Sequence, residues 1–270
     1  MWGVKTQDIV GPPATLFHFA EDGSGLTGVG AVTLSGVEID VDGLAMNAQG
    51  VLYGFAVTSS GASSQLLTID TTTAVATAIG TPVDLDIRGA VFAADGRLLT
   101  LDAQNNELLE INPATGAAVG PGIGLTVAGV GQDVSTITDI AQGPDGAFTV
   151  SGIGTVLNEL YSLDVATGQA VLVHTDTVVM LDGRLPALVG LAFSDAAPDP
   201  DVLFAFDVNN SEDILAYQTD AAYARTVLHA NIFPAYNAGR GDLATTPVPE
   251  PASMLLIALA APLVVRRKRR

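Results

Sequence analysis

One short strand pattern occurs five times along the chain. Each copy has large apolar residues at its third and fifth positions, a period of two that is typical of a strand with one buried face. The copies begin at Thr15, Gln65, Glu107, Glu159 and Asp213, which are 50, 42, 52 and 54 residues apart. A repeat of this length holds about four strands, the size of one β-propeller blade.

The sequence before most copies predicts two further strands around a tight turn. Residues 43–46 and 51–55 flank Asn47-Ala48-Gln49-Gly50, and residues 89–92 and 98–101 flank Asp95-Gly96. Turns of this kind supply positive φ between antiparallel strands. Residues 139–150 and 191–206 follow the same plan, and Ala-Thr-Gly turns after the third strand lead to a fourth.

The two ends of the chain supply the missing parts of one blade. Residues 240–244 match a first strand with no partner after it, and residues 2–5 match a second strand with none before it. We therefore expect residues 1–245 to form an all-β propeller of five four-stranded blades, closed by the N- and C-terminal strands. Closure of this kind removes a free sheet edge. A β-sandwich or a solenoid is the alternative.

The repeated units also resemble the NHL-like and quinoprotein-like propellers. The resemblance rests on a polar turn, a Leu-Tyr strand and an Ile-Asp strand before Ala-Thr-Gly, and it covers most of residues 2–244. It implies the fold and no particular activity.

The charge of the body excludes some classes of partner. Residues 1–249 hold 6 basic and 28 acidic residues, a net charge of −22. Binding to a nucleic-acid backbone needs clustered Lys and Arg, so we expect no nucleic-acid partner. The chain has no Cys, which excludes disulfides, zinc thiolates and a thiol nucleophile.

The last 25 residues, 246–270, differ from the body and form a second predicted region. A Pro-rich stretch leads to an uncharged apolar run over residues 252–265, for which we expect a short helix. Five basic residues end the chain: Arg266, Arg267, Lys268, Arg269 and Arg270. The run is shorter than the roughly 17–25 residues that span a bilayer, although the basic side chains can extend it. By the positive-inside rule the basic cluster stays cytoplasmic.

This region resembles the PEP-CTERM sorting signal of Gram-negative bacteria. The motif residues are Val248, Pro249, Glu250 and Pro251, and the apolar run and the basic cluster follow in the family's order. The resemblance implies that an exosortase, a membrane protease, is a partner. It also implies that residues 252–265 enter the inner membrane transiently before the body reaches the cell surface. A plain C-terminal membrane anchor is the alternative.

The start of the sequence departs from the family's pattern. Sorting-signal proteins begin with a secretory signal peptide, whereas Met1 to Asp8 contain no apolar segment. We expect the upstream reading frame to encode that export segment.

The sequence contains no catalytic motif that we can identify. Its three His residues, His18, His174 and His229, stand in no metal-ligand or nucleophile pattern. Arg240-Gly241-Asp242 looks like a cell-adhesion tripeptide, but it opens a predicted inner strand.

Acidic residues in the connections between strands are the remaining candidates for a site. In a propeller these connections open around the channel, where carboxylates could bind Ca²⁺. The connections contain Asp40, Asp42, Asp84, Asp86, Asp102, Asp133, Asp182, Asp207 and Asp213. Asp84, Asp86, Asp133 and Asp207 are the candidate ligands. The alternative is that these are solvated loops whose charge keeps the body soluble.

Two functions follow. The first is an exported, exosortase-processed surface or matrix protein, whose propeller is a non-enzymatic module that binds a polysaccharide or a surface protein and has no cofactor other than Ca²⁺. The second is a propeller hydrolase or lyase with a metal at the central channel. The scarcity of His speaks against the second.

Overall fold

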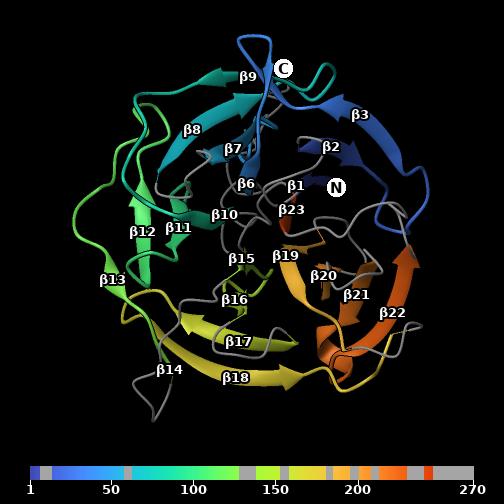
Figure 1. Ribbon diagram of the computed structural model, residues 1–270. Coiled ribbons are helices and arrows are strands. Elements are labelled where there is room, and N and C mark those ends of the chain that lie inside the picture. The colour runs from blue at the N-terminus through green and yellow to red at the C-terminus, as the bar shows by residue number, and fades with distance from the viewer. Residues whose placement is uncertain are drawn as a thin grey trace, which may run out of the picture.

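A computed structural model shows five β-sheets arranged around a central axis (Figure 1). It describes residues 1–6, 14–57, 63–127, 138–152, 158–180, 185–194, 201–207, 213–229 and 240–245. The only helix within these ranges is the 3-10 turn η1 (Thr219–Ala221). The predicted five-bladed, all-β propeller is therefore confirmed.

Each blade runs outward from an inner strand. The first blade contains β23 (Arg240–Ala244), β1 (Trp2–Thr6), β2 (Thr15–His18) and β3 (Thr27–Ala31). The second contains β6 (Val41–Met46), β7 (Leu52–Val57), β8 (Ser64–Ile69) and β9 (Val75–Ala78). The third contains β10 (Ile87–Phe92), β11 (Leu98–Asp102), β12 (Glu107–Ile111) and β13 (Ile123–Gly124).

The other two blades follow the same plan. The fourth contains β15 (Asp139–Gln142), β16 (Phe148–Ser151), β17 (Glu159–Asp164) and β18 (Gln169–Thr175). The fifth contains β19 (Leu188–Phe193), β20 (Val202–Asp207), β21 (Ile214–Gln218) and β22 (Ala224–His229).

Two blades are larger than the expected four strands. The second gains β4 (Thr33–Leu34) and β5 (Val37–Glu38), and the fourth gains β14 (Thr126–Val127). β4 joins β9 and β14 joins β18, each through a short parallel pairing. All three extra strands are two residues long, so they show no periodicity that a sequence pattern could detect.

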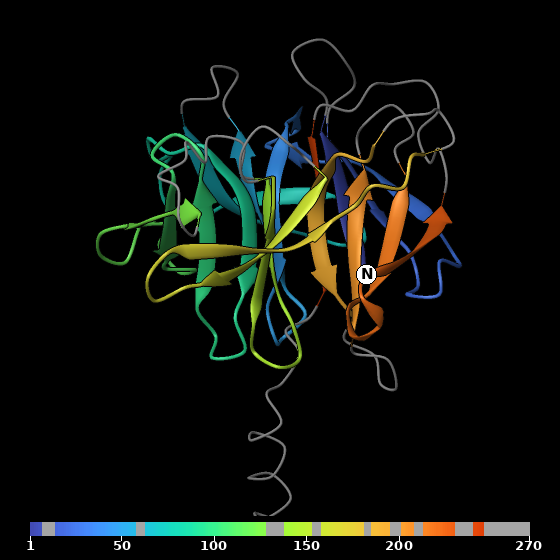
Figure 2. The same cartoon turned by 90° about the horizontal axis from the view of Figure 1, so that it is seen from below.

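The ring is closed by the two ends of the described chain. β1 pairs antiparallel with β23, with Trp2 opposite Ala244 and Thr6 opposite Arg240. The inner strands then contact one another around the axis in the order β23, β6, β10, β15 and β19. Figure 2 shows the same ring from the side, with the inner strands running along the axis.

The core lies between neighbouring blades. Phe17 and Phe19 of the first blade pack on Phe206 and Phe204 of the fifth, with ring centroids 6.1 and 6.4 Å apart. Similar mixed clusters join the third blade to the fourth and the second to the third. Burial of a Phe side chain contributes roughly 1.5–3 kcal/mol, so these interfaces hold the blades together.

Several predictions lie outside the described residues. These are the helix at 252–265, the motif residues Val248, Pro249, Glu250 and Pro251, and the terminal basic cluster. In the described ranges, no helix is long and apolar enough to cross a membrane.

Candidate functional site

The five inner strands place one equivalent residue each on the propeller axis. Aligning the strands by their apolar residues makes Gly43, Gly89, Asp139, Gly190 and Asp242 equivalent. Asp139 and Asp242 have no exposed surface. Two carboxyl groups therefore lie buried at the centre of the ring, and three glycines lie at the equivalent places on the other strands.

The glycines leave space for the two Asp residues. A Cβ built on Gly89 would lie 2.5 Å from Asp139 Cα, and one on Gly190 would lie 2.8 Å from Asp242 Cα. Real Cβ atoms do not approach other atoms so closely. The axis therefore has room for two side chains at this level, and Asp139 and Asp242 take it.

The residue after each axial position donates its backbone N–H to this pair. Asp242 accepts from Leu44 at 2.5 Å and from Leu243 at 2.7 Å. Asp139 accepts from Ile140 at 2.7 Å, from Leu191 and from Ala90. Every blade thus contributes one amide to the carboxyl pair, and these hydrogen bonds satisfy donors that would otherwise be buried without a partner.

The two carboxyl groups also hydrogen-bond to each other. Because a carboxylate only accepts, such a bond needs a proton between them. Burial raises the pKa of Asp139 to about 7, and burial together with the charge of Asp139 raises the pKa of Asp242 well above its usual range. A proton is therefore retained between the two carboxyl groups, and it belongs to the pair and not to one of the two residues.

A cavity opens on the axis next to the pair, on the side of the turns between first and second strands. It holds about 350 Å³ of empty space, open solvent at its mouth included. Its walls are mainly apolar, with Met46, Phe92 and Phe193 among them. The polar residues Gln142 and Thr245 are already engaged: Gln142 bonds Ala94 N and Gly146 O, and Thr245 Oγ1 donates to Phe193 O.

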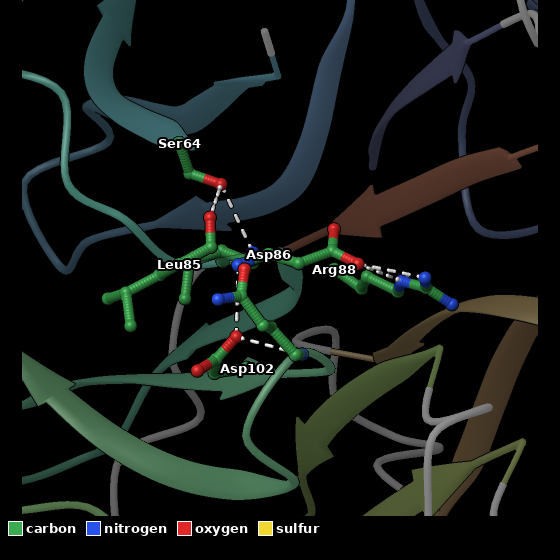
Figure 3. Close-up of polar contacts among 7 residues, drawn as sticks. Ser64, Leu85, Asp86, Arg88 and Asp102 are labelled. Carbon is green, nitrogen blue, oxygen red and sulfur yellow. Dashed lines mark hydrogen bonds and ion pairs between the residues drawn. The ribbon is translucent and has the colours of Figure 1, made fainter. Parts of the chain in front are cut away.

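On the other side of the pair, hydrogen bonds fix the strand that enters the third blade (Figure 3). Asp86 forms an ion pair with Arg88 at 2.8 Å, and its N–H donates to Asp102 at 2.9 Å. Ser64 Oγ donates to Leu85 O and accepts from Ile87 N. These side chains position the start of β10 and leave Asp86 bound to a cation of the chain itself.

Buried carboxylates serve the same purpose in the fifth blade. Asp207 is fully buried at the end of β20, as Asp102 is at the end of β11. Asp207 accepts the N–H of Ala187, three residues before Gly190, and Asp102 accepts that of Asp86, three residues before Gly89. The repeated position indicates a structural acceptor that anchors the connection between blades.

The candidate calcium ligands take up different environments. Asp84 is exposed, Asp86 is paired with Arg88, and Asp207 bonds a backbone amide, while Asp133 lies outside the described residues. The described residues contain no group of three or more His, Asp or Glu that could hold a metal ion. Calcium binding by these four residues stays a prediction.

A second buried polar cluster joins the fourth and fifth blades. Asp176 Oδ2 accepts from Tyr217 Oη and from Arg225 Nη1, each at 2.7 Å. His174 stacks on Tyr223 with ring centroids 4.9 Å apart, and burial lowers the pKa of its imidazole. The Arg225 and Asp176 side chains are only 9% and 2% exposed, so this cluster is an interblade clasp.

Sequence reasoning missed the axial pair although the signal was present. The five inner strands can be aligned in the sequence. However, two Asp residues at a position that is otherwise Gly indicate a carboxyl pair only when the strands are known to surround one axis. The same observation explains Arg240-Gly241-Asp242. Asp242 is buried and bonded to backbone amides, so a receptor cannot bind its carboxylate in the folded ring.

The comparisons with known proteins indicate the fold. No protein-family model matches this sequence, and no curated protein sequence matches it. Among solved structures, a protein of unknown function from Bacteroides thetaiotaomicron is similar over 87% of this chain and 60% of its own, with 11% identity and a TM-score of 0.51.

Two lyase structures are also similar. Virginiamycin B lyase from Staphylococcus aureus is 13% identical over 83% of this chain and 69% of its own, with a TM-score of 0.45. A streptogramin B lyase is 12% identical over 79% of this chain and 61% of its own, with a TM-score of 0.42. This chain thus spans 60–69% of the length of the three structures, and at such low identity the likeness is one of fold alone.

Proposed function

We propose that this protein is an exported β-propeller that an exosortase processes at its C-terminal sorting signal, and that the propeller acts at the cell surface as a binding or structural module. The observation that carries the proposal is the position of the motif relative to the closed ring. The last strand of the ring, β23, ends at Ala244, and Val248 follows four residues later. Removal of the motif and of everything after it takes no strand from the five described sheets.

The charge distribution of the chain supports the same division. The terminal cluster holds five of the 11 basic residues, whereas the segment up to residue 249 carries −22. Cleavage would separate a membrane-retained basic end from a strongly acidic body. An acidic body of this kind is soluble and suits release to the cell surface.

The hydrogen bonds on the propeller axis favour a binding or structural module over an enzyme. Many propellers use the central channel for ligands, and here the two axial carboxyl groups accept five backbone amides and bond each other. Most of their acceptor capacity is therefore used within the ring. The alternative, a hydrolase or lyase with a metal at the channel, would need those oxygens as ligands, so the described residues favour it less.

The partner that we propose for the mature body is a polysaccharide or another surface protein. A rigid ring with five blade interfaces can present loops at fixed positions. The resemblance of the tail, and not the fold, suggests this location.

The experiment is expression of the full chain, behind an added export signal, in a host that contains an exosortase and in the same host without it. We expect a shortened, soluble protein in the first host and a full-length, membrane-bound protein in the second, as measured by intact mass and fractionation. Glu250→Ala should block shortening, whereas Asp220→Ala, on the exposed 3-10 turn, should not. Full-length, membrane-bound protein in both hosts would contradict the proposal and favour a plain anchor.

A further inference from the structure

We propose that Asp139 and Asp242 share a proton and that this proton stabilises the closure of the propeller. With a proton shared between them, the two carboxyl groups accept one amide from each blade. Without it, two adjacent buried negative charges repel each other and weaken the attachment of β23, the closing strand. This inference rests on the described ring and does not depend on the proposed sorting function.

The carboxyl pair is hydrogen-bonded to every inner strand of the ring. Its five amide donors come from β6, β10, β15, β19 and β23, which are all the inner strands. Asp242 itself lies on β23, and its Oδ2 bonds Leu44 of the second blade. Asp139 bonds both the third and the fifth blade. A change in the charge of the pair therefore alters a hydrogen bond in every blade.

Among the described residues, no cation is a main cause of the pKa of either carboxyl group. The charged residues on the strands that pack around it are Asp42 of β6, Arg88 of β10, Lys5 of β1, Asp102 of β11 and Asp207 of β20, while the side chain of Arg240 on β23 lies outside the described set. Arg88 is engaged by Asp86. β15 has no charged residue besides Asp139, and β19 has none. Burial and the partner carboxyl group are therefore what favour the protonated form.

The direction of the pH effect follows from proton counting. In the unfolded chain both carboxyl groups ionise near pH 3.9, whereas in the folded ring the pKa of Asp139 is raised to about 7 and the pKa of Asp242 is raised as well. The folded state thus binds more protons, and the stabilisation is fully present below the unfolded pKa and is lost as pH rises through the folded pKa. Between those values the unfolding equilibrium constant should rise about tenfold per pH unit for each proton that only the folded pair holds, and each such factor equals about 1.4 kcal/mol.

The test is chemical unfolding of the full chain between about pH 5 and about pH 8, for the wild type and for Asp242→Asn. The Asn side chain keeps a carbonyl oxygen for an amide and an N–H to donate to Asp139, but it cannot lose the proton. Asp139 stays buried in the variant and still takes up a proton, so we expect the variant to lose one factor of ten per pH unit relative to the wild type and to keep the share of Asp139. Asp102→Asn is the matched control, because Asp102 is equally buried and also accepts backbone amides. It should lower stability without removing the dependence.

A second measurement needs no stable variant. Selective ¹³C labelling of Asp Cγ in the wild type should show two carboxyl signals that titrate together around or above neutral pH, far from the ordinary value near 3.9. Assignment comes from Asp242→Asn or, if that chain does not fold, from Asp139→Asn. Ordinary titration of every Asp signal would overturn the proposal, as would an Asp242→Asn variant with the wild-type pH dependence.

Discussion

At the scale of single residues, the role of an Asp side chain depends on its position in the ring. Asp139 and Asp242 occupy a place where the other three strands have Gly, and a side chain at Gly89 or Gly190 would overlap them. The sequence contains these identities, but their convergence depends on the closed ring. The candidate calcium ligand Asp207 shows the same dependence on the fold. Asp207 lies in an acidic connection by sequence, yet its carboxylate bonds the amide of Ala187.

Substitution of an axial glycine tests this packing. Gly89→Ala places a Cβ 2.5 Å from Asp139 Cα, which is backbone and cannot rotate away. We expect the free energy of unfolding to fall by about 2–3 kcal/mol, the usual effect of overpacking. Gly28→Ala is the control, since Gly28 has no atom within 4 Å of its Cβ position and no positive φ. It should change stability by less than about 0.5 kcal/mol in thermal unfolding. Equal effects of the two substitutions would contradict the packing.

The interblade clasp gives a second residue-scale prediction. Tyr217→Phe removes the hydroxyl that donates to Asp176 at 2.7 Å and keeps the buried ring. A hydrogen bond to a charged group contributes about 1.5–3 kcal/mol, so urea unfolding should show a loss of that size. Tyr53→Phe should change little, because no described residue bonds the Tyr53 hydroxyl. An unchanged midpoint for Tyr217→Phe would show that the clasp does not stabilise the fourth and fifth blades.

At the scale of elements, the sequence predicted the regular strands of the blades but not the three short extra strands. The third strands and the first two strands of each blade lie where the period-two pattern and the turns predicted them. The hydrogen bonds of the turns explain why. Asp164 is the last residue of β17. It accepts from Ala166 N at 2.9 Å and from Thr167 Oγ1 at 2.8 Å, and so fixes the reversal into β18. β4, β5 and β14 were missed because their pairings depend on neighbours distant in sequence.

The stabilising effect of the Asp164 turn cap should depend on pH. The Thr167 hydroxyl, with the amides of Ala166 and Thr167, lowers the pKa of Asp164. A lowered pKa stabilises the fold above the unfolded value and ceases to do so as pH falls through the folded value. Asp164→Ala should therefore lower the melting temperature more at about pH 7, above the unfolded pKa, than at about pH 2, well below the unfolded pKa. Glu38→Ala, at an exposed site on β5, serves as control. An effect of Asp164→Ala that is equal at both pH values would contradict the role of the carboxylate.

At the scale of the whole molecule, the ring is complete within the described residues. β23 and β1 come from opposite ends of the described chain, pair along five residues and bring the first blade between the second and the fifth. Leu243 of β23 is 1% exposed and packs with Phe17 and Phe206. The closure of the ring could be predicted from the two incomplete end strands. The axial pair could not, because it arises only when all five blades meet.

In the described structure, residues up to Thr245 form a ring that β23 closes, and the proposed sorting region follows this ring in the sequence. The most direct measurement compares thermal unfolding and solution mass of two chains, one ending at Thr245 and one ending at Gly239. We expect the longer chain to be monomeric and to unfold cooperatively. The shorter chain lacks Asp242 and Leu243 and exposes the inner edge of β1, so it should unfold without cooperativity or self-associate. A chain ending at Gly239 that is as stable and monomeric as the other would contradict the account.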